Sequence, residues 1–92
     1  SARNTQTFTS SSTSVSATSH ASISITLATP SGFVLAGVLQ VKTNHASALQ
    51  LTGFTMGSET SMTVDVYNRT SSAQDTTVTV KVNYIKASAS VS

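Results

Sequence analysis

Apolar and polar residues alternate along much of this chain, and no stretch has the three-to-four-residue spacing of an amphipathic helix. The clearest alternation lies in residues 22–27, 61–67 and 77–84, where an aliphatic or aromatic side chain occupies every second position. Because successive side chains of a strand point to opposite faces, each run predicts a strand with one buried face. The sequence therefore indicates an all-β domain.

Two less regular strands are predicted between these runs. Residues 33–41 are almost continuously apolar, which is typical of a strand buried on both faces, and Gly37 within them suggests a bulge. Residues 49–54 mark another strand, whose alternation shifts phase at Gly53. Polar or turn-forming segments separate the strands at residues 30–32, 43–47, 57–60 and 68–75.

The first 19 residues are rich in serine and threonine, with Phe8 and Val15 as their sizeable apolar side chains. This composition fits a linker, whereas the partial alternation around these two residues fits a strand added at a sheet edge. Both alternatives stay open for residues 1–19. Residues 20–92 form the predicted domain, and five or six short strands without a helix indicate a small antiparallel β-sandwich or jelly-roll-like fold.

Composition points to a protein that works outside the cytosol or within an assembly. Serine and threonine make up 34 of the 92 residues, whereas charged residues make up 9%. A chain this short buries a modest core, and it contains no cysteine for a disulfide or a thiolate metal site. We therefore expect a homo-oligomer. The chain does not begin with methionine, so we also expect it to be the C-terminal piece of a longer protein.

Charge and hydropathy argue against two classes of partner. The net charge of +2 comes from scattered lysines and arginines, whereas nucleic-acid binding needs clustered ones, so we expect no nucleic-acid partner. No apolar run approaches the roughly 18–20 residues of a membrane span, so we expect no membrane insertion.

Candidate catalytic and metal-binding groups are sparse. His20 and His45 are far apart in the sequence and lack a third nearby ligand, so we expect solvated loop histidines and no metal. Glu59 and Asp75 fall in predicted turns and Asp65 in a strand, an arrangement that does not suggest a glycosidase pair. There is no Gly-x-Ser-x-Gly motif and no glycine-rich phosphate loop. We expect no enzyme and no cofactor.

Binding of a saccharide is the function that the remaining residues favour. Tyr67 falls on the face opposite Val64 and Val66, which makes either an exposed ring or an interface ring plausible, and Asn68 and Arg69 follow it. The predicted loop at residues 43–47 offers further hydrogen-bonding groups. The candidate ligand-binding residues are therefore Asn44, His45, Tyr67, Asn68 and Arg69.

The other aromatic and amide signals have plainer interpretations. Phe33 and Phe54 are expected in the core, and Tyr84 is expected there with its hydroxyl at the rim. Asn68-Arg-Thr70 matches the acceptor pattern for N-glycosylation, which arises by chance in a threonine-rich chain.

Residues 20–86 resemble a C-terminal module of phage and prophage tail proteins, including receptor-binding proteins and tail fibres. In both, a hydroxyl-alternating strand leads through a turn into an aromatic and an apolar strand, here residues 22–33 and 34–38. Both also end in a strand, an asparagine-containing turn and a Val/Thr strand closing on an aromatic residue, here residues 64–68 and 76–86. Two features depart from the pattern: residues 40–60 carry no family signature, and Phe33 stands where a tyrosine is common.

The resemblance implies a trimeric head on the virion, outside the cell, that adheres without catalysis to a host-surface polysaccharide or other glycan. Such a head would also contact other virion proteins. Two alternatives stay open: a structural trimerisation or capsid-decoration domain of a virion, and a carbohydrate-binding module of a larger hydrolase. The second usually displays more exposed aromatic rings than this chain offers.

Overall fold

The computed structural model describes residues 3–87, which form eight β-strands and no helix. Each strand in turn runs antiparallel to its hydrogen-bonded neighbours. The strands are β1 (Arg3–Thr9), β2 (Thr13–Val15), β3 (Ser19–Thr26), β4 (Phe33–Thr43), β5 (Leu49–Ser58), β6 (Ser61–Asn68), β7 (Gln74–Thr76) and β8 (Val78–Lys86).

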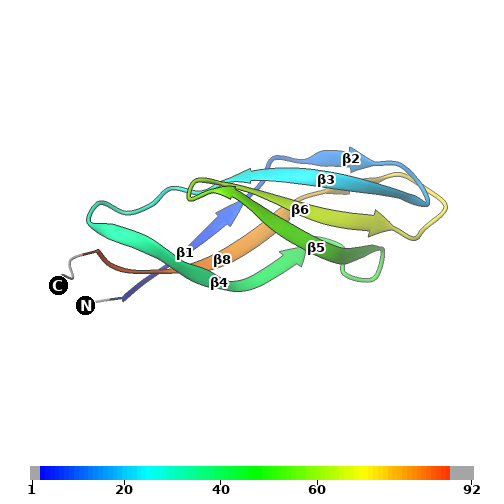
Figure 1. Ribbon diagram of the computed structural model, residues 1–92. Coiled ribbons are helices and arrows are strands. Elements are labelled where there is room, and N and C mark those ends of the chain that lie inside the picture. Colours follow the sequence, from blue (N-terminus) through cyan, green and yellow to red (C-terminus); the bar gives the residue numbers. More distant parts are fainter. Residues whose placement is uncertain (1–2, 88–92) are drawn as a thin grey trace.

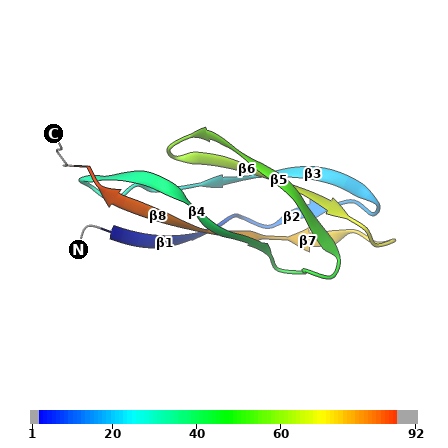
Figure 2. The same cartoon turned by 60° about the horizontal axis from the view of Figure 1, so that its bottom comes forward.

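The strands form two layers (Figure 1). One layer is the sheet β1-β8-β4, which the short ribbon β2-β7 continues, and the other is the sheet β3-β6-β5. The layers face each other in a narrow molecule of 54 × 20 × 18 Å (Figure 2). The prediction of a small antiparallel β-sandwich is confirmed.

The three alternating runs build the core, as predicted. Their apolar side chains lie between the layers with at most 3% of their surface exposed, while the intervening residues face outward. Burying each such side chain contributes about 1.5–3 kcal/mol. The buried residues on these strands, with Leu27 just beyond β3, are Ile23, Ile25, Leu27, Met62, Val64, Val66, Val78, Val80, Val82 and Tyr84.

Strand β4 differs from its prediction. Its nearly continuous apolar sequence suggested burial on both faces, which is wrong, because none of its residues is fully buried. It is an edge strand, paired only with β8, and its outer face meets solvent. The bulge is confirmed: the pairing with β8 shifts between Leu35 and Gly37, and again between Val38 and Gln40.

Strand β5 is the edge of the opposite sheet. Its predicted change of phase is confirmed, since the pairing with β6 shifts between Leu51 and Gly53. Leu49 is buried, but Phe54 is 48% exposed, so the prediction that Phe54 lies in the core is wrong. Phe54 pairs with Val64 and shares its inward face, yet no strand of the other sheet covers this edge. Phe33 does pack against the core.

The first described residues belong to the sandwich. Strand β1 pairs with β8 along its whole length, and β2 pairs with β7. Val15 is 1% exposed in the core, and Phe8 packs against it. Of the two alternatives for the first 19 residues, the described residues 3–19 contain edge strands.

Two local features complete the fold. Gly32 has φ +82°, a left-handed conformation that suits glycine, and its carbonyl accepts a 2.9 Å hydrogen bond from Ala87 N–H, which ties the predicted turn to the end of β8. The Tyr84 hydroxyl was expected at the rim, but Tyr84 is wholly buried, and its hydroxyl has no hydrogen-bond partner among the described residues.

Candidate functional site

The outer face of the sheet β3-β6-β5 carries an aromatic pair at one end of the molecule. His20 on β3 and Gln50 on β5 both pair with Tyr67 on β6, so the three residues form a row across the sheet. Residues in register point to the same face, and Tyr67 alternates with the buried Val66 and Asn68. The rings of His20 and Tyr67 have centroids 4.7 Å apart and are tilted by 43°.

The neighbouring row adds a carboxylate and a hydroxyl. Ser22 pairs with Asp65, and its hydroxyl donates a 2.8 Å hydrogen bond to Asp65 Oδ1. Gly53 stands opposite Asp65 on β5 and places no side chain over it. A shallow hollow of about 420 Å³ lies here, lined by His20, Ala21, Ser22, Thr52 and Asp65.

This face combines an aromatic surface with hydrogen-bonding groups, which are the two components of a site that binds a polyol. The carboxylate accepts hydrogen bonds, and hydroxyl, amide and imidazole groups can donate or accept them. Toward the β5–β6 hairpin the outward residues are hydroxyl-bearing: Ser24, Thr26, Thr55, Ser58, Ser61 and Thr63. The aromatic pair and Asp65 therefore lie toward one end of this face, and the strand residues toward the hairpin carry hydroxyls.

The predicted site residues separate into distinct positions. Tyr67 lies half-buried on the outer face, within the row described above. Asn44 is exposed, but its amide holds the chain: Nδ2 donates to the Asp75 carbonyl at 2.9 Å, and Oδ1 accepts from Thr77 N–H at 3.1 Å. Its side chain therefore links the β4–β5 loop to the start of β8.

His45 and Arg69 meet at that same loop, residues 44–48. The His45 carbonyl accepts from the N–H groups of Ala48 and Leu49, and its side chain is exposed. Arg69 Nε donates to the Ser47 carbonyl at 3.0 Å, and Arg69 N–H donates to the Ala48 carbonyl. Arg69 thus fixes the loop beside the end of β6, and its remaining guanidinium donors stay available.

Asn68 cannot contribute to a surface site. It is wholly buried, and Nδ2 donates to the carbonyls of Val15, Ser16 and Ser72 at 2.9–3.2 Å. Oδ1 accepts from the N–H and the hydroxyl of Thr70. The prediction that Asn68 binds a ligand is therefore wrong, because its amide is committed to the fold. The same burial keeps the glycosylation-like motif from acting as an acceptor.

Four residues of this face were not predicted as site residues: His20, Ser22, Asp65 and Gln50. His20 was expected in a loop, but it lies in β3, and the alternation of the sequence already indicated this. In residues 20–26, every second position is polar and opposite to Ile23 and Ile25, so His20 shares the face of Ser22. The sequence did not carry the register that brings His20 beside Tyr67.

Within residues 3–87, no three His, Cys, Asp or Glu side chains cluster closely enough to hold a metal ion. The described part of the chain also contains no helix that is long and apolar enough to cross a membrane.

Comparison with family models, with curated proteins and with solved structures finds no match for this chain. The family resemblance stays a prediction.

Proposed function

We propose that this domain is a non-catalytic adhesion module of a phage tail that binds a host-surface saccharide through the outer face of β3-β6-β5. The observation that carries the proposal is the row of His20, Tyr67 and Gln50 beside the Ser22–Asp65 pair. A pyranose ring presents C–H groups on its faces and hydroxyls around its rim. C–H groups pack on the electron-rich face of an aromatic ring, and hydroxyls pair with carboxylate and amide groups.

The position of this face suits adhesion. Strand β1 begins and β8 ends at the same end of the molecule, where Arg3 pairs with Ile85 (Figure 1). The aromatic pair lies toward the opposite end, where β3 begins and β6 ends. Anything joined to either terminus would therefore lie far from the candidate site.

A trimer is part of this proposal. A shallow site on a flat sheet buries little of its ligand and binds weakly, whereas several linked copies raise the apparent affinity by about 10²–10⁴. An apolar pair on the outer face of the other sheet supports association: Val34 and Ile85 are in register and are 36% and 43% exposed. This pair lies at the end where the described chain begins and ends.

The second candidate is a structural domain that recognises other virion proteins. The exposed apolar residues along β4 and β5 favour it, since contiguous apolar surface marks protein contacts.

Tyr67→Ala and Asp65→Ala test the saccharide site. We expect each to weaken binding about tenfold or more in glycan-array and cell-wall pulldown measurements, because each removes a principal contact. Lys81→Ala is the matched control, since Lys81 is an exposed residue on the outer face of the other sheet and should leave binding unchanged.

Two results would overturn this site. One is a wild-type chain that binds bare capsids or tails but no host polysaccharide, which would favour the structural role. The other is equal loss of binding in Lys81→Ala and Tyr67→Ala.

A further inference from the structure

The sandwich is open along one side, where the edge strands β4 and β5 face each other. Each pairs on one side only, β4 with β8 and β5 with β6, and the loop 44–48 joins them at one end. The other side is closed, because the chain passes from β2 into β3 and Asn68 on β6 holds the carbonyls of Val15 and Ser16.

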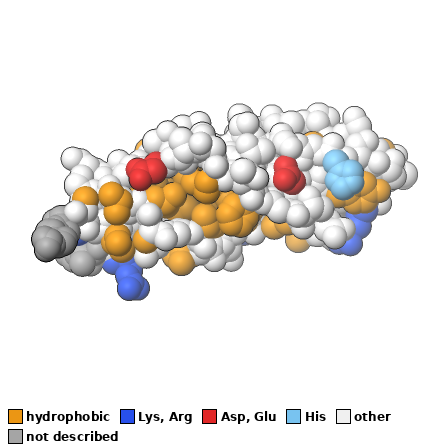
Figure 3. Space-filling model, viewed as in Figure 1, with side chains coloured by type: hydrophobic (Ala, Val, Ile, Leu, Met, Phe, Trp, Pro, Cys, Tyr) orange, Lys and Arg blue, Asp and Glu red, His pale blue; other side chains and the backbone are white. Residues whose placement is uncertain are grey.

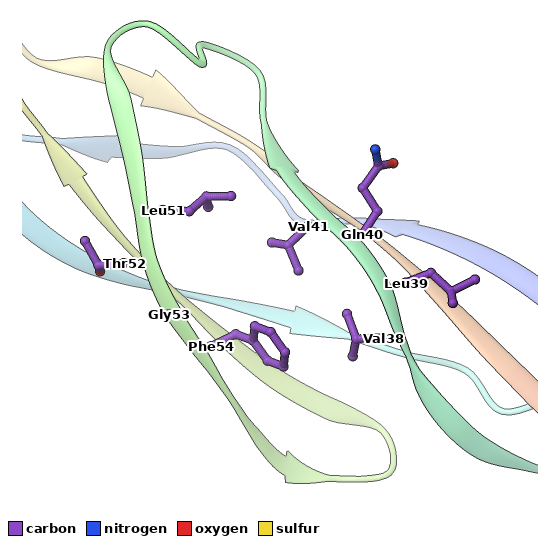
Figure 4. Close-up of a pocket in the computed structure, with 8 residues that line it drawn as sticks. All are labelled: Val38, Leu39, Gln40, Val41, Leu51, Thr52, Gly53 and Phe54. Atoms are coloured by element: carbon purple, nitrogen blue, oxygen red, sulfur yellow. The ribbon is translucent and has the colours of Figure 1, made fainter.

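An apolar groove of about 470 Å³ occupies the open side. The side chains of Val38 and Val41 from β4 point across it toward Leu51 and Phe54 from β5 (Figure 4). Leu51 and Phe54 are 39% and 48% exposed. Figure 3 shows hydrophobic side chains gathered over this gap, in the middle of a largely polar face.

The groove continues into a second hollow with a basic end. The two hollows share Val41 and Leu51, and the second is also lined by Lys42 and Arg69. Among the described residues, no carboxylate lines either hollow. Arg69 Nε is held by the Ser47 carbonyl, so the guanidinium is positioned there. An occupant complementary to this surface is apolar along its length and acidic at the end near Lys42 and Arg69.

The edges themselves favour an extended occupant. A segment laid along a free strand edge gains backbone hydrogen bonds and places every second side chain on the apolar floor. The bulges limit its length, since the longest stretches of regular pairing are residues 40–43 of β4 and 53–56 of β5. Bulges of this kind hinder two whole edges from joining, which argues against a second copy pairing here through its own β4 or β5.

We propose that the β4–β5 groove binds a short extended segment of a partner protein, with alternating apolar side chains and a carboxylate at the end facing Lys42 and Arg69. The segment would add a strand to the sandwich and cover Leu51 and Phe54. The saccharide site lies mainly on the outer face of β3-β6-β5, and it borders the groove through Thr52 and Gln50 of β5.

Binding of defined peptides to the 92-residue chain tests the groove. The probes are two capped six-residue peptides of alternating valine and threonine, one with an aspartate at its first position and one with an aspartate at its last. Two further peptides are identical except that lysine replaces the aspartate. Fluorescence anisotropy should show one aspartate peptide binding about tenfold more tightly than its lysine counterpart, and Lys42→Glu should abolish that preference.

Phe54→Ser and Leu39→Ser form a matched pair of variants. Both residues are exposed and both border the groove, but the Phe54 side chain points into it, whereas the Leu39 side chain points away from β5 (Figure 4). We expect Phe54→Ser to weaken peptide binding about tenfold and Leu39→Ser to leave it unchanged. Circular dichroism spectra that match the wild type would show that both variants are folded.

Three outcomes would overturn the proposal: no peptide binds, the two serine variants lose binding equally, or Phe54→Ser lowers the mass of a self-assembled species. The last would make the groove a contact between copies. Phe54→Ser should still bind saccharide, because the outer face of β3-β6-β5 is unaltered. A failure of the groove proposal can therefore be told apart from a failure of the proposed function.

Discussion

At the scale of single residues, Asn68 shows that a shift of one position along a strand decides whether a side chain is buried or exposed. Residues 62, 64, 66 and 68 share the inward face of β6, so the alternation that turns Tyr67 outward also turns Asn68 inward. Asn68 was predicted at the surface because asparagine is mostly exposed in folded proteins. The buried amide is stable because the ends of β2 and the loop after β6 supply its partners, and their positions are not encoded locally.

Replacing this amide should destabilise the domain strongly. Asn68→Ala removes the side-chain donor to the carbonyls of Val15 and Ser16, while the Ser72 carbonyl can still accept from the Thr70 hydroxyl, and each unsatisfied buried group costs about 1–3 kcal/mol. We expect a loss of about 3 kcal/mol or more in the free energy of unfolding, measured by urea denaturation. Asn44→Ala is the control, because water can replace the bonds of this exposed amide, and it should cost about 1 kcal/mol or less. Equal losses would refute the assigned role of Asn68.

At the scale of strands, alternation was a reliable guide and apolar content was not. Residues 22–27, 61–67 and 77–84 form strands with the predicted inward faces, because a two-residue period directly encodes one-sided burial. Residues 33–41 were predicted to be buried on both faces, yet β4 is an edge strand with an exposed outer face. Whether a strand has one neighbour or two depends on topology, and the apolar side chains of β4 serve the open groove as well as the core.

Deleting β1 tests whether this strand is part of the fold. Deleting residues 1–9 removes the neighbour that pairs with β8 from Arg3 to Thr9 and also removes Phe8, which packs on the core. We expect the truncated chain to lose most of the 5–15 kcal/mol typical of a small domain and to melt without a cooperative transition. The measurement is thermal unfolding followed by circular dichroism. The full-length Thr5→Ser/Thr7→Ser variant is the control, since it alters only exposed side chains and keeps the strand. An unchanged melting temperature after truncation would mean that residues 1–9 act as a linker.

At the scale of the whole molecule, the sandwich carries three separate candidate binding surfaces. The aromatic pair lies on one sheet, the apolar groove follows the open side, and the pair Val34 and Ile85 lies on the outer face of the other sheet. The alternation pointed to an all-β domain, and the composition pointed to polar surfaces. Neither could separate these surfaces, because each combines residues from strands that are distant in sequence, and only the register brings them together.

The pair Val34 and Ile85 tests the expected trimer apart from the other two surfaces. Light scattering should give the chain three times its single-chain mass. The variant Val34→Thr/Ile85→Thr should have the single-chain mass, because both changes keep a β-branched side chain while removing apolar contact area.

The monomeric variant should keep the affinity of each site for a soluble saccharide fragment but lose about 10²–10⁴-fold in retention on a surface displaying many copies. Phe54→Ser should leave the mass unchanged. A single-chain mass for the wild type at all concentrations would remove the trimer from the proposal, and the observed adhesion would then have to come from one site.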